Sequence, residues 1–165
     1  MIVVVMGVCG CGKTTVGRAL AEDMGWPFHD ADDFHPVANV AKMAAGDPLS
    51  DDDRRPWLDR LASEMAAIEA RGDHAVLACS ALKEAYRHHL SRACGVRIVY
   101  LKGDVATIAP RLAARAGHYM PASLLQSQFA TLEEPDDATV VDIRLPVAEQ
   151  VAVIRRDLLP AVRAA

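Results

Sequence analysis

The feature that most constrains this 165-residue chain is a glycine-rich segment that directly follows a short apolar run. Residues 7–14 read Gly-Val-Cys-Gly-Cys-Gly-Lys-Thr and match the pattern G-x-x-x-x-G-K-[ST]. The apolar residues Val3–Met6 before it predict a buried strand. After it, Val16, Leu20 and Met24 share one face of a predicted helix. A strand, this loop and a helix in that order predict a phosphate-binding loop for a nucleotide.

The loop residues have distinct expected tasks. Glycines let the backbone turn so that N–H groups point at phosphate oxygens, and the following helix adds the positive end of its dipole. Lys13 is expected to place its ammonium on the β- and γ-phosphates, and Thr14 to offer a hydroxyl to Mg²⁺. The alternative is a glycine-rich turn with a surface lysine. We predict that ATP contacts Gly7, Gly10, Cys11, Gly12, Lys13, Thr14 and Thr15.

Short apolar runs alternate with helix-like segments along the whole chain. Predicted strands are Val3–Met6, Pro27–Asp30, Ala75–Cys79, Val96–Leu101 and Thr139–Ile143. Several are near-continuous aliphatic runs, which is typical of strands buried on both faces of a parallel sheet. We therefore predict a three-layer α/β fold with a five-stranded parallel sheet, formed by residues 1–165 as one domain. The helix after residue 50 has Asp51 to Asp53 as candidates for its N-terminal cap.

Composition excludes some classes of function. The net charge of −4 provides no basic excess for nucleic acid or an anionic membrane surface. No run approaches the roughly 20 apolar residues of a membrane span. The start lacks a basic region and continues directly into the loop, so we expect a strand rather than a signal peptide, and a cytoplasmic protein. The four cysteines are expected to be reduced.

Acidic side chains cluster where the second predicted strand ends. Asp30 and Asp32 follow it, and ligands of parallel α/β sheets gather at this end of the strands. Such a pair suits a kinase: Asp30 is predicted to hold Mg²⁺ through a bound water, and Asp32 to accept the proton of the attacking hydroxyl. The alternative is that they cap a helix, which is the favoured reading for Asp33. His35 either contacts the substrate or donates to a backbone carbonyl.

Two cations follow the third predicted strand. Lys83 and Arg87 are four residues apart, so they would share a helix face close to the ligand end of the sheet. We predict that both contact an anionic substrate. The alternative is a pair of solvated surface cations.

Several longer blocks resemble the gluconate kinase family, a group of P-loop small-molecule kinases related to shikimate and adenylate kinases. The most specific are NVAKMAAGDPLSDDDRRPWL at 39–58 and CSALKEAYRHHL at 79–90. Others are MGVCGCGKTTVG at 6–17, DADDFHP at 30–36, VYLKGD at 99–104, RLAARAGHYMPASLLQSQFATLEEP at 111–135 and VVDI at 140–143. The match departs in small ways, with cysteines where the loop often has serines and Ala31 where glycine is common.

The resemblance implies a kinase that transfers the γ-phosphoryl group of ATP to the 6-hydroxyl of D-gluconate, as a homodimer. It implies that Arg54 contacts the substrate, although Arg54 and Arg55 could instead be solvated or paired. It also implies a small mobile lid at about 111–125, in which Arg111 and Arg115 offset developing charge on the phosphates. Adenine would rest near Asp142–Pro146.

Two other functions stay open on the sequence alone. One is a kinase of this fold with another small acceptor, such as shikimate or a nucleotide. The other is a nucleotide-binding module without catalysis, against which the intact Lys13, Thr14 and Asp32 argue. A GTPase is disfavoured because the chain has no N-K-x-D sequence.

Overall fold

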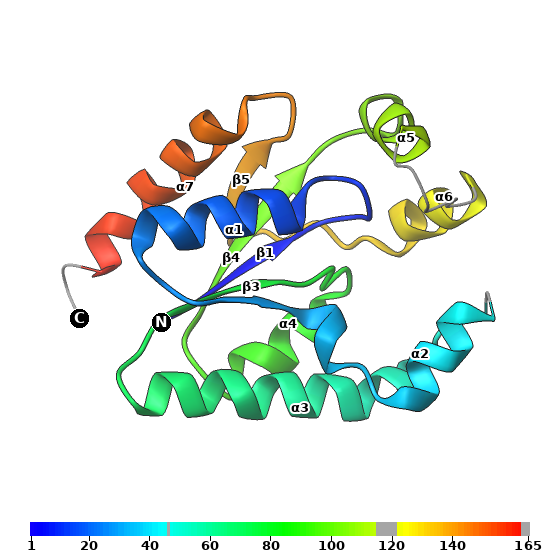
Figure 1. The fold of residues 1–165 in the computed structure, drawn as a ribbon, viewed down its shortest axis with the longest axis horizontal. Coiled ribbons are helices and arrows are strands. Elements are labelled where there is room, and N and C mark those ends of the chain that lie inside the picture. The colour runs from blue at the N-terminus through cyan, green and yellow to red at the C-terminus, as the bar shows by residue number, and fades with distance from the viewer. Residues whose placement is uncertain (46, 115–121, 163–165) are drawn as a thin grey trace.

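A five-stranded parallel sheet with helices on both faces forms the body of the protein (Figure 1). The computed structural model describes residues 1–45, 47–114 and 122–162. The predicted α/β fold and all five predicted strands are confirmed, each strand differing from its prediction by one residue at one end. The strands are β1 (Ile2–Met6), β2 (Phe28–Asp30), β3 (Ala75–Ala78), β4 (Val96–Lys102) and β5 (Thr139–Asp142).

The helices form two outer layers and a group at one end of the sheet. In Figure 1, α1 (Lys13–Met24) and α7 (Val147–Val162) cover one face, and α3 (Asp51–Ala70) and α4 (Glu84–Ser91) cover the other. Toward the carboxyl ends of the strands lie α2 (Val37–Ala44), α5 (Val105–Ala113) and α6 (Ala122–Thr131). A 3₁₀ helix, Ala31–Phe34, follows β2. Among the described residues no helix is long and apolar enough to cross a membrane.

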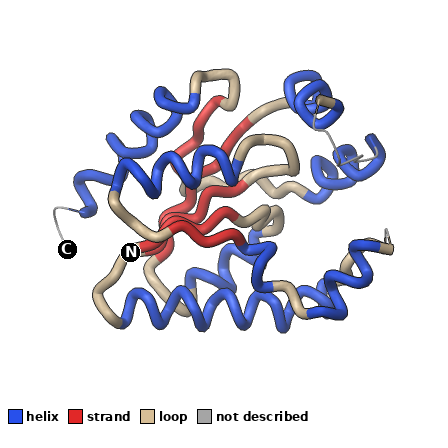
Figure 2. Tube along the Cα trace, viewed as in Figure 1, coloured by secondary structure: helices blue, strands red, loops and turns tan. Residues whose placement is uncertain are grey.

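The strand order β2-β3-β1-β4-β5 determines where a ligand can bind. All four neighbouring pairs are parallel, so the strands end at the same edge, where Figure 2 shows the connecting loops. The chain leaves β1 toward β2 on one side and leaves β4 toward β5 on the other. Ligands of such sheets bind where neighbouring connections diverge, here beyond the carboxyl end of β1.

Strand β1 is buried on both sides because it lies at the centre of the sheet. Val3 and Val5 belong to the core formed with α1 and α7, and Val4 and Met6 to the core formed with α3 and α4. This explains the uninterrupted apolar sequence of the strand, since neither face meets water.

The N-terminal cap of α3 differs from the prediction. Ser50, not one of the three aspartates after it, is the cap: its Oγ accepts the Asp53 N–H at 3.1 Å. The Asp53 carboxylate in turn accepts the Ser50 N–H at 2.8 Å, which completes a reciprocal capping box. Asp53 therefore supports the cap from the third helical position, and Asp51 is left for contacts with α4.

Candidate active site

The loop between β1 and α1 has the backbone that a phosphate cradle requires. Gly7, Gly10 and Gly12 have φ of 144°, 81° and 102°, a region that residues with a side chain rarely adopt. A Cβ atom at Gly10 would lie 2.7 Å from Leu112, whereas one at Gly12 would meet nothing within 4 Å. Gly12 caps α1, so the loop runs directly into a helix N-terminus with its unpaired N–H groups.

Lys13 folds back over this loop. Its ammonium donates to the carbonyl of Val8 at 3.0 Å, which keeps the charge beside the cradle. Thr15 is exposed in the first turn of α1, where helix N–H groups have no intrahelical partner. Cys11 is buried, and burial raises the pKa of its thiol despite the nearby positive charge of Lys13. Its backbone N–H donates to the Val8 carbonyl at 3.3 Å, so its predicted contact with ATP requires an exchange of this hydrogen bond.

Thr14 and Asp30 meet across the loop. The Thr14 hydroxyl donates to one Asp30 oxygen at 3.2 Å, and the Asp32 N–H donates to the other at 3.2 Å. Asp30 therefore caps the 3₁₀ helix, one of the two functions offered as alternatives, while its other oxygen accepts the Thr14 hydroxyl. Hydroxyl and carboxylate oxygens are ligands that suit Mg²⁺. Among the described residues no group of three or more His, Cys, Asp or Glu side chains could hold a metal ion.

Asp32 lies two residues beyond Asp30 and presents its carboxylate to solvent, with 90% of the side chain exposed. Surrounding protein raises the pKa of Asp32, and the negative charge of Asp30 raises it further, while His35 and Lys13 oppose the shift. Because the side chain is so exposed, water screens these effects. Asp32 thus lies beyond the carboxyl end of β2 as an exposed carboxylate whose pKa is raised above that of an ordinary aspartate.

His35 is packed behind Asp32. Its side chain is 7% exposed, its ring stacks on Trp57 with 4.5 Å between centroids, and its Nε2 lies 4.0 Å from Asp32. Burial lowers the pKa of His35, with Asp32 partly offsetting the effect, so the ring is neutral at pH 7. Asn39 Nδ2, which can only donate, faces Nδ1 at 3.5 Å, an arrangement that leaves the ring proton on Nε2 toward Asp32.

Trp57 fixes this acidic segment in place, a role that the sequence analysis did not predict. Its indole N–H donates to the Ala31 carbonyl at 2.8 Å, in a buried hydrogen bond between residues 26 positions apart. The carbonyl between Asp30 and Asp32 is thereby tied to α3. The sequence gives only a modest signal for this hydrogen bond, because all it indicates is that a buried tryptophan N–H needs a partner.

Arg54 and Lys83 gather around Asp51. Lys83 donates to both Asp51 oxygens at 2.8 and 2.9 Å, and the Tyr86 hydroxyl donates to the same carboxylate. The Arg54 guanidinium lies 3.7 Å from Asp51 and donates to the Leu49 carbonyl at 2.6 Å. The hydrogen bonds from Lys83 and Tyr86, and to a smaller extent the charge of Arg54, lower the pKa of Asp51. Two predicted substrate contacts are thus brought together, with an acidic residue between them.

Arg87 is not placed as predicted. Helix α4 begins at Glu84, so Lys83 precedes the helix and does not share a helix face with Arg87. Arg87 is buried, at 8% exposed, which excludes the alternative of a solvated surface cation. Its guanidinium donates to the carbonyls of Ala81 and Leu82 at 3.0 and 3.2 Å. Ala81 has φ of 42°, so Arg87 stabilises a strained turn at the end of β3.

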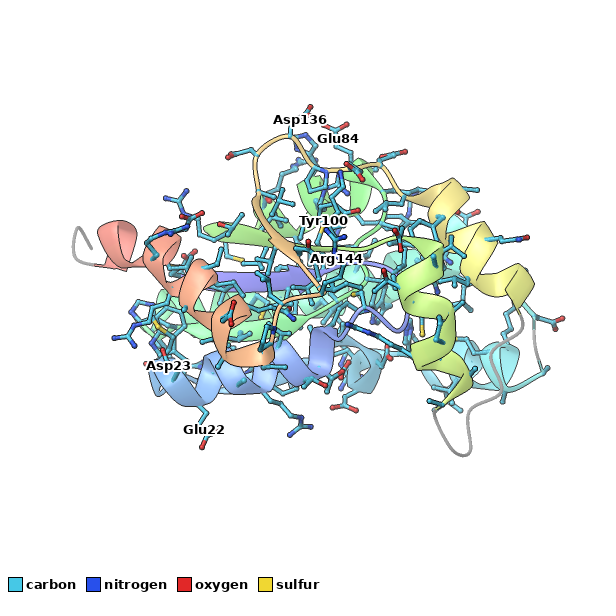
Figure 3. All side chains as sticks on the ribbon, turned by 90° about the horizontal axis from the view of Figure 1, so that it is seen from above. Glu22, Asp23, Glu84, Tyr100, Asp136 and Arg144 are labelled. Carbon is cyan, nitrogen blue, oxygen red and sulfur yellow. The ribbon has the colours of Figure 1, made fainter. Side chains whose placement is uncertain are left out.

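Acidic residues surround Arg87 as well. Burial lowers the pKa of Arg87, and the charges of Glu133, Glu84 and Asp136 partly oppose this; the last two residues are labelled in Figure 3. Glu133 accepts the Glu84 N–H at 2.5 Å, so it caps α4 from another part of the chain. This is a role for Glu133 that sequence reasoning did not find.

Arg111 connects α5 to the end of β5. Its guanidinium donates to the Ile143 carbonyl at 2.9 Å, next to the segment where adenine was expected. In the same segment Arg144, labelled in Figure 3, pairs with Asp142 at 2.5 Å. Arg115 and the other lid residues at 116–121 lie outside the described residues, and α5 ends at Ala113.

Gln128 of α6 reaches the phosphate loop, another contact that the sequence analysis missed. Its Oε1 accepts the Cys9 N–H at 2.6 Å across 119 positions of sequence. The sequence indicates this contact only through the position of Gln128, a polar residue at helical spacing from the apolar Leu125 and Leu132.

A glycine cradle with a lysine, a hydroxyl–carboxylate pair beside it and a free carboxylate at the same sheet edge together define a P-loop kinase of the small-molecule type. Comparisons with known proteins agree. A family model described as shikimate kinase matches residues 9–155. A gluconokinase of Gluconobacter oxydans is 50% identical over 143 residues, which cover 85% of this chain and 80% of that protein.

Two further relatives extend the match to nearly the full chain. A probable gluconokinase of Xenopus tropicalis is 44% identical over 170 residues, covering 93% of this chain and 89% of that protein. The crystal structure of a gluconokinase from Sinorhizobium meliloti 1021 aligns with a TM-score of 0.87 at 40% identity, over 99% of this chain and 96% of that one. The chain belongs to the gluconokinase family.

Proposed function

We propose that this protein is a gluconokinase, which transfers the γ-phosphoryl group of ATP to the 6-hydroxyl of D-gluconate. The observation that carries the proposal is the junction of Thr14, Asp30 and Asp32. One carboxylate accepts both the loop hydroxyl and the backbone N–H of the residue that offers the second carboxylate. This junction couples a phosphate site to an acid–base group, and the related gluconokinases supply the acceptor.

ATP is held by the loop and the start of α1. The N–H groups around Gly10 and Gly12 point at phosphate oxygens, and Lys13 exchanges the Val8 carbonyl for the β- and γ-phosphates. Arg111, and by the family resemblance Arg115, would offset charge on the phosphates in the transition state.

Thr14 and Asp30 form the candidate site for Mg²⁺, since their oxygens lie 3.2 Å apart at the loop. When bound, the ion neutralises charge on the phosphates. The small number of protein ligands fits Mg²⁺, which keeps several waters and binds mainly through substrate phosphates.

Asp32 orients the 6-hydroxyl of the acceptor and takes its proton. The neutral His35, whose Nε2 lies 4.0 Å from this carboxylate, helps to hold it in place. Arg54 and Lys83 bind the carboxylate of gluconate, exchanging part of their contact with Asp51. Arg87 supports the turn after β3 by donating to the carbonyls of Ala81 and Leu82, and a further N–H of its guanidinium group binds the substrate.

The test is a panel of acceptors with ATP and Mg²⁺, including D-gluconate, other sugar acids, shikimate and nucleoside monophosphates, with ADP release as the measurement. D-Gluconate should give the highest kcat/KM, and 6-phosphogluconate should be the product. Equal or higher turnover of another acceptor would end the assignment. ATP binding without turnover of any acceptor would instead favour a non-catalytic module.

Two further parts of the proposal concern the setting of the enzyme. A cytoplasmic location suits an enzyme that uses ATP and a small sugar acid. A homodimer is expected from the family resemblance, and sedimentation equilibrium of the purified chain tests it.

A further inference from the structure

Helix α6 packs against the core that β1 forms with α1 and α7, and the amide of Gln128 lies on its packed side. Leu125 is 2% exposed, and Phe129 and Leu132 pack against the same core. Gln128 lies three and four residues from Leu125 and Leu132, so it shares their helix face. A polar side chain on a face that packs inward needs a hydrogen-bond partner.

The partner of Gln128 is the backbone of the phosphate loop. The Cys9 N–H donates to its Oε1 at 2.6 Å, and the bond is partly buried. The next loop residue, Gly10, is approached by Leu112 of α5, since a Cβ there would lie 2.7 Å from it. Two helices that are distant in sequence from the loop therefore hold its first half.

We propose that Gln128 is a positioning residue that holds the phosphate loop in its ATP-binding conformation by accepting the Cys9 N–H. The inference rests on the proposed use of ATP. An N–H committed to Gln128 fixes the peptide plane at position 9, so the loop does not turn this group toward another acceptor. The N–H groups later in the loop then bind the phosphates without the entropy cost of ordering the loop first.

The proposal predicts an effect confined to the nucleotide side. Among the contacts of the described residues, Gln128 reaches the loop and none of Asp32, His35 or Arg54. Loss of its carbonyl should therefore weaken ATP and leave the acceptor nearly untouched. A residue that merely supports the fold would instead change stability, kcat and both KM values together.

Three variants of the full-length chain separate these cases. Gln128→Met keeps the length of the side chain and removes the amide acceptor. Gln128→Glu keeps an oxygen acceptor at the same reach. Gln126→Met makes the same chemical change at an exposed position of α6 and is the matched control. The measurements are KM for ATP and gluconate, the Kd of ADP, melting temperature, and hydrogen exchange of the peptide that contains residues 7–12 without nucleotide.

We expect Gln128→Met to raise KM for ATP and Kd for ADP about tenfold, the scale of one unpaired N–H. KM for gluconate should stay close to the value of the unsubstituted protein, and the melting temperature should fall by no more than about 2–4 °C, as one unpaired N–H implies. Hydrogen exchange of the loop should be faster in this variant alone, with Gln128→Glu and Gln126→Met unchanged.

Unchanged nucleotide affinity and loop exchange in Gln128→Met would overturn the proposal. A parallel loss of stability and of affinity for both substrates would also overturn it, by showing a structural role. The exchange and ADP measurements need no phosphoryl acceptor, so a failure of the gluconokinase assignment would be seen separately in the acceptor panel.

Discussion

Replacing Asp32 with asparagine tests the centre of the proposed mechanism. Asparagine keeps the shape and the polarity of the side chain but removes a base that takes the proton of the attacking hydroxyl. General-base catalysis of this kind contributes about 10²–10⁴-fold to rate, or roughly 3–5 kcal/mol of barrier. We expect Asp32→Asn to lower kcat by that factor, and the Kd of ATP to change by less than about threefold.

The position of Asp32 in the structure separates an effect on catalysis from an effect on folding. The Asp32 side chain is 90% exposed, and the neutral ring of His35 lies 4.0 Å from its carboxylate. Substitutions at such positions usually change unfolding free energy by less than about 0.5 kcal/mol. A loss of kcat therefore reports chemistry rather than folding. Asp33→Asn is the matched control, because this neighbouring aspartate is also exposed and has no assigned role.

The pH dependence gives an independent check on the same residue. The pKa of Asp32 is raised by the surrounding protein and then by Asp30, and the base works only when deprotonated. Activity should thus fall, as pH decreases, at a value above the usual pKa of aspartate near 3.9. This acid limb should appear in kcat/KM for gluconate. The assignment of Asp32 is refuted if Asp32→Asn keeps kcat within threefold, or if Asp33→Asn loses as much.

Three other substitutions test the parts of the site around Asp32. Trp57→Phe removes the buried donor to the Ala31 carbonyl and should lower unfolding free energy by about 1–3 kcal/mol in urea titrations, since it leaves that carbonyl unpaired. Gly10→Ala should abolish measurable ATP binding, while Gly72→Ala, with a similar positive φ but open space around it, should cost stability alone. The pKa of Asp53 is lowered to about 2 by Lys42 and the Ser50 cap, so its contribution is present above pH 4 and lost toward pH 2. The melting temperatures of the unsubstituted protein and Asp53→Asn should therefore differ at pH 6 and converge near pH 2.

The strands and the phosphate loop were predictable because their signals are local. Val3–Met6 is apolar without interruption since both faces are buried, and the loop glycines carry φ values that other residues avoid. Asp30 could be placed at the same sheet edge as the loop from the prediction of a parallel sheet, because parallel strands end at one edge. Its hydrogen bond with Thr14 follows from that placement.

The missed features depend on groups that are far apart in sequence. Burial of Arg87 requires the carbonyls of a turn in which Ala81 has a positive φ, and nothing in the local pattern of α4 indicates that turn. The choice of Ser50 over three adjacent aspartates depends on where α3 starts to pack, since serine and aspartate are both favoured caps. Gln128 and Cys9 are 119 positions apart, so only the folded chain brings them together.

The site divides into a donor half and an acceptor half with different physical demands. The donor half uses backbone N–H groups, which every P-loop kinase has, so the loop cannot select the acceptor. Selection must come from side chains on α3 and α4, where Arg54 and Lys83 are held by Asp51. An anionic acceptor has to compete with this internal carboxylate for the cations, whereas a neutral polyol would leave them paired with it. The arrangement therefore favours an acceptor that carries a carboxylate, and it does so in a protein whose overall charge of −4 would repel one.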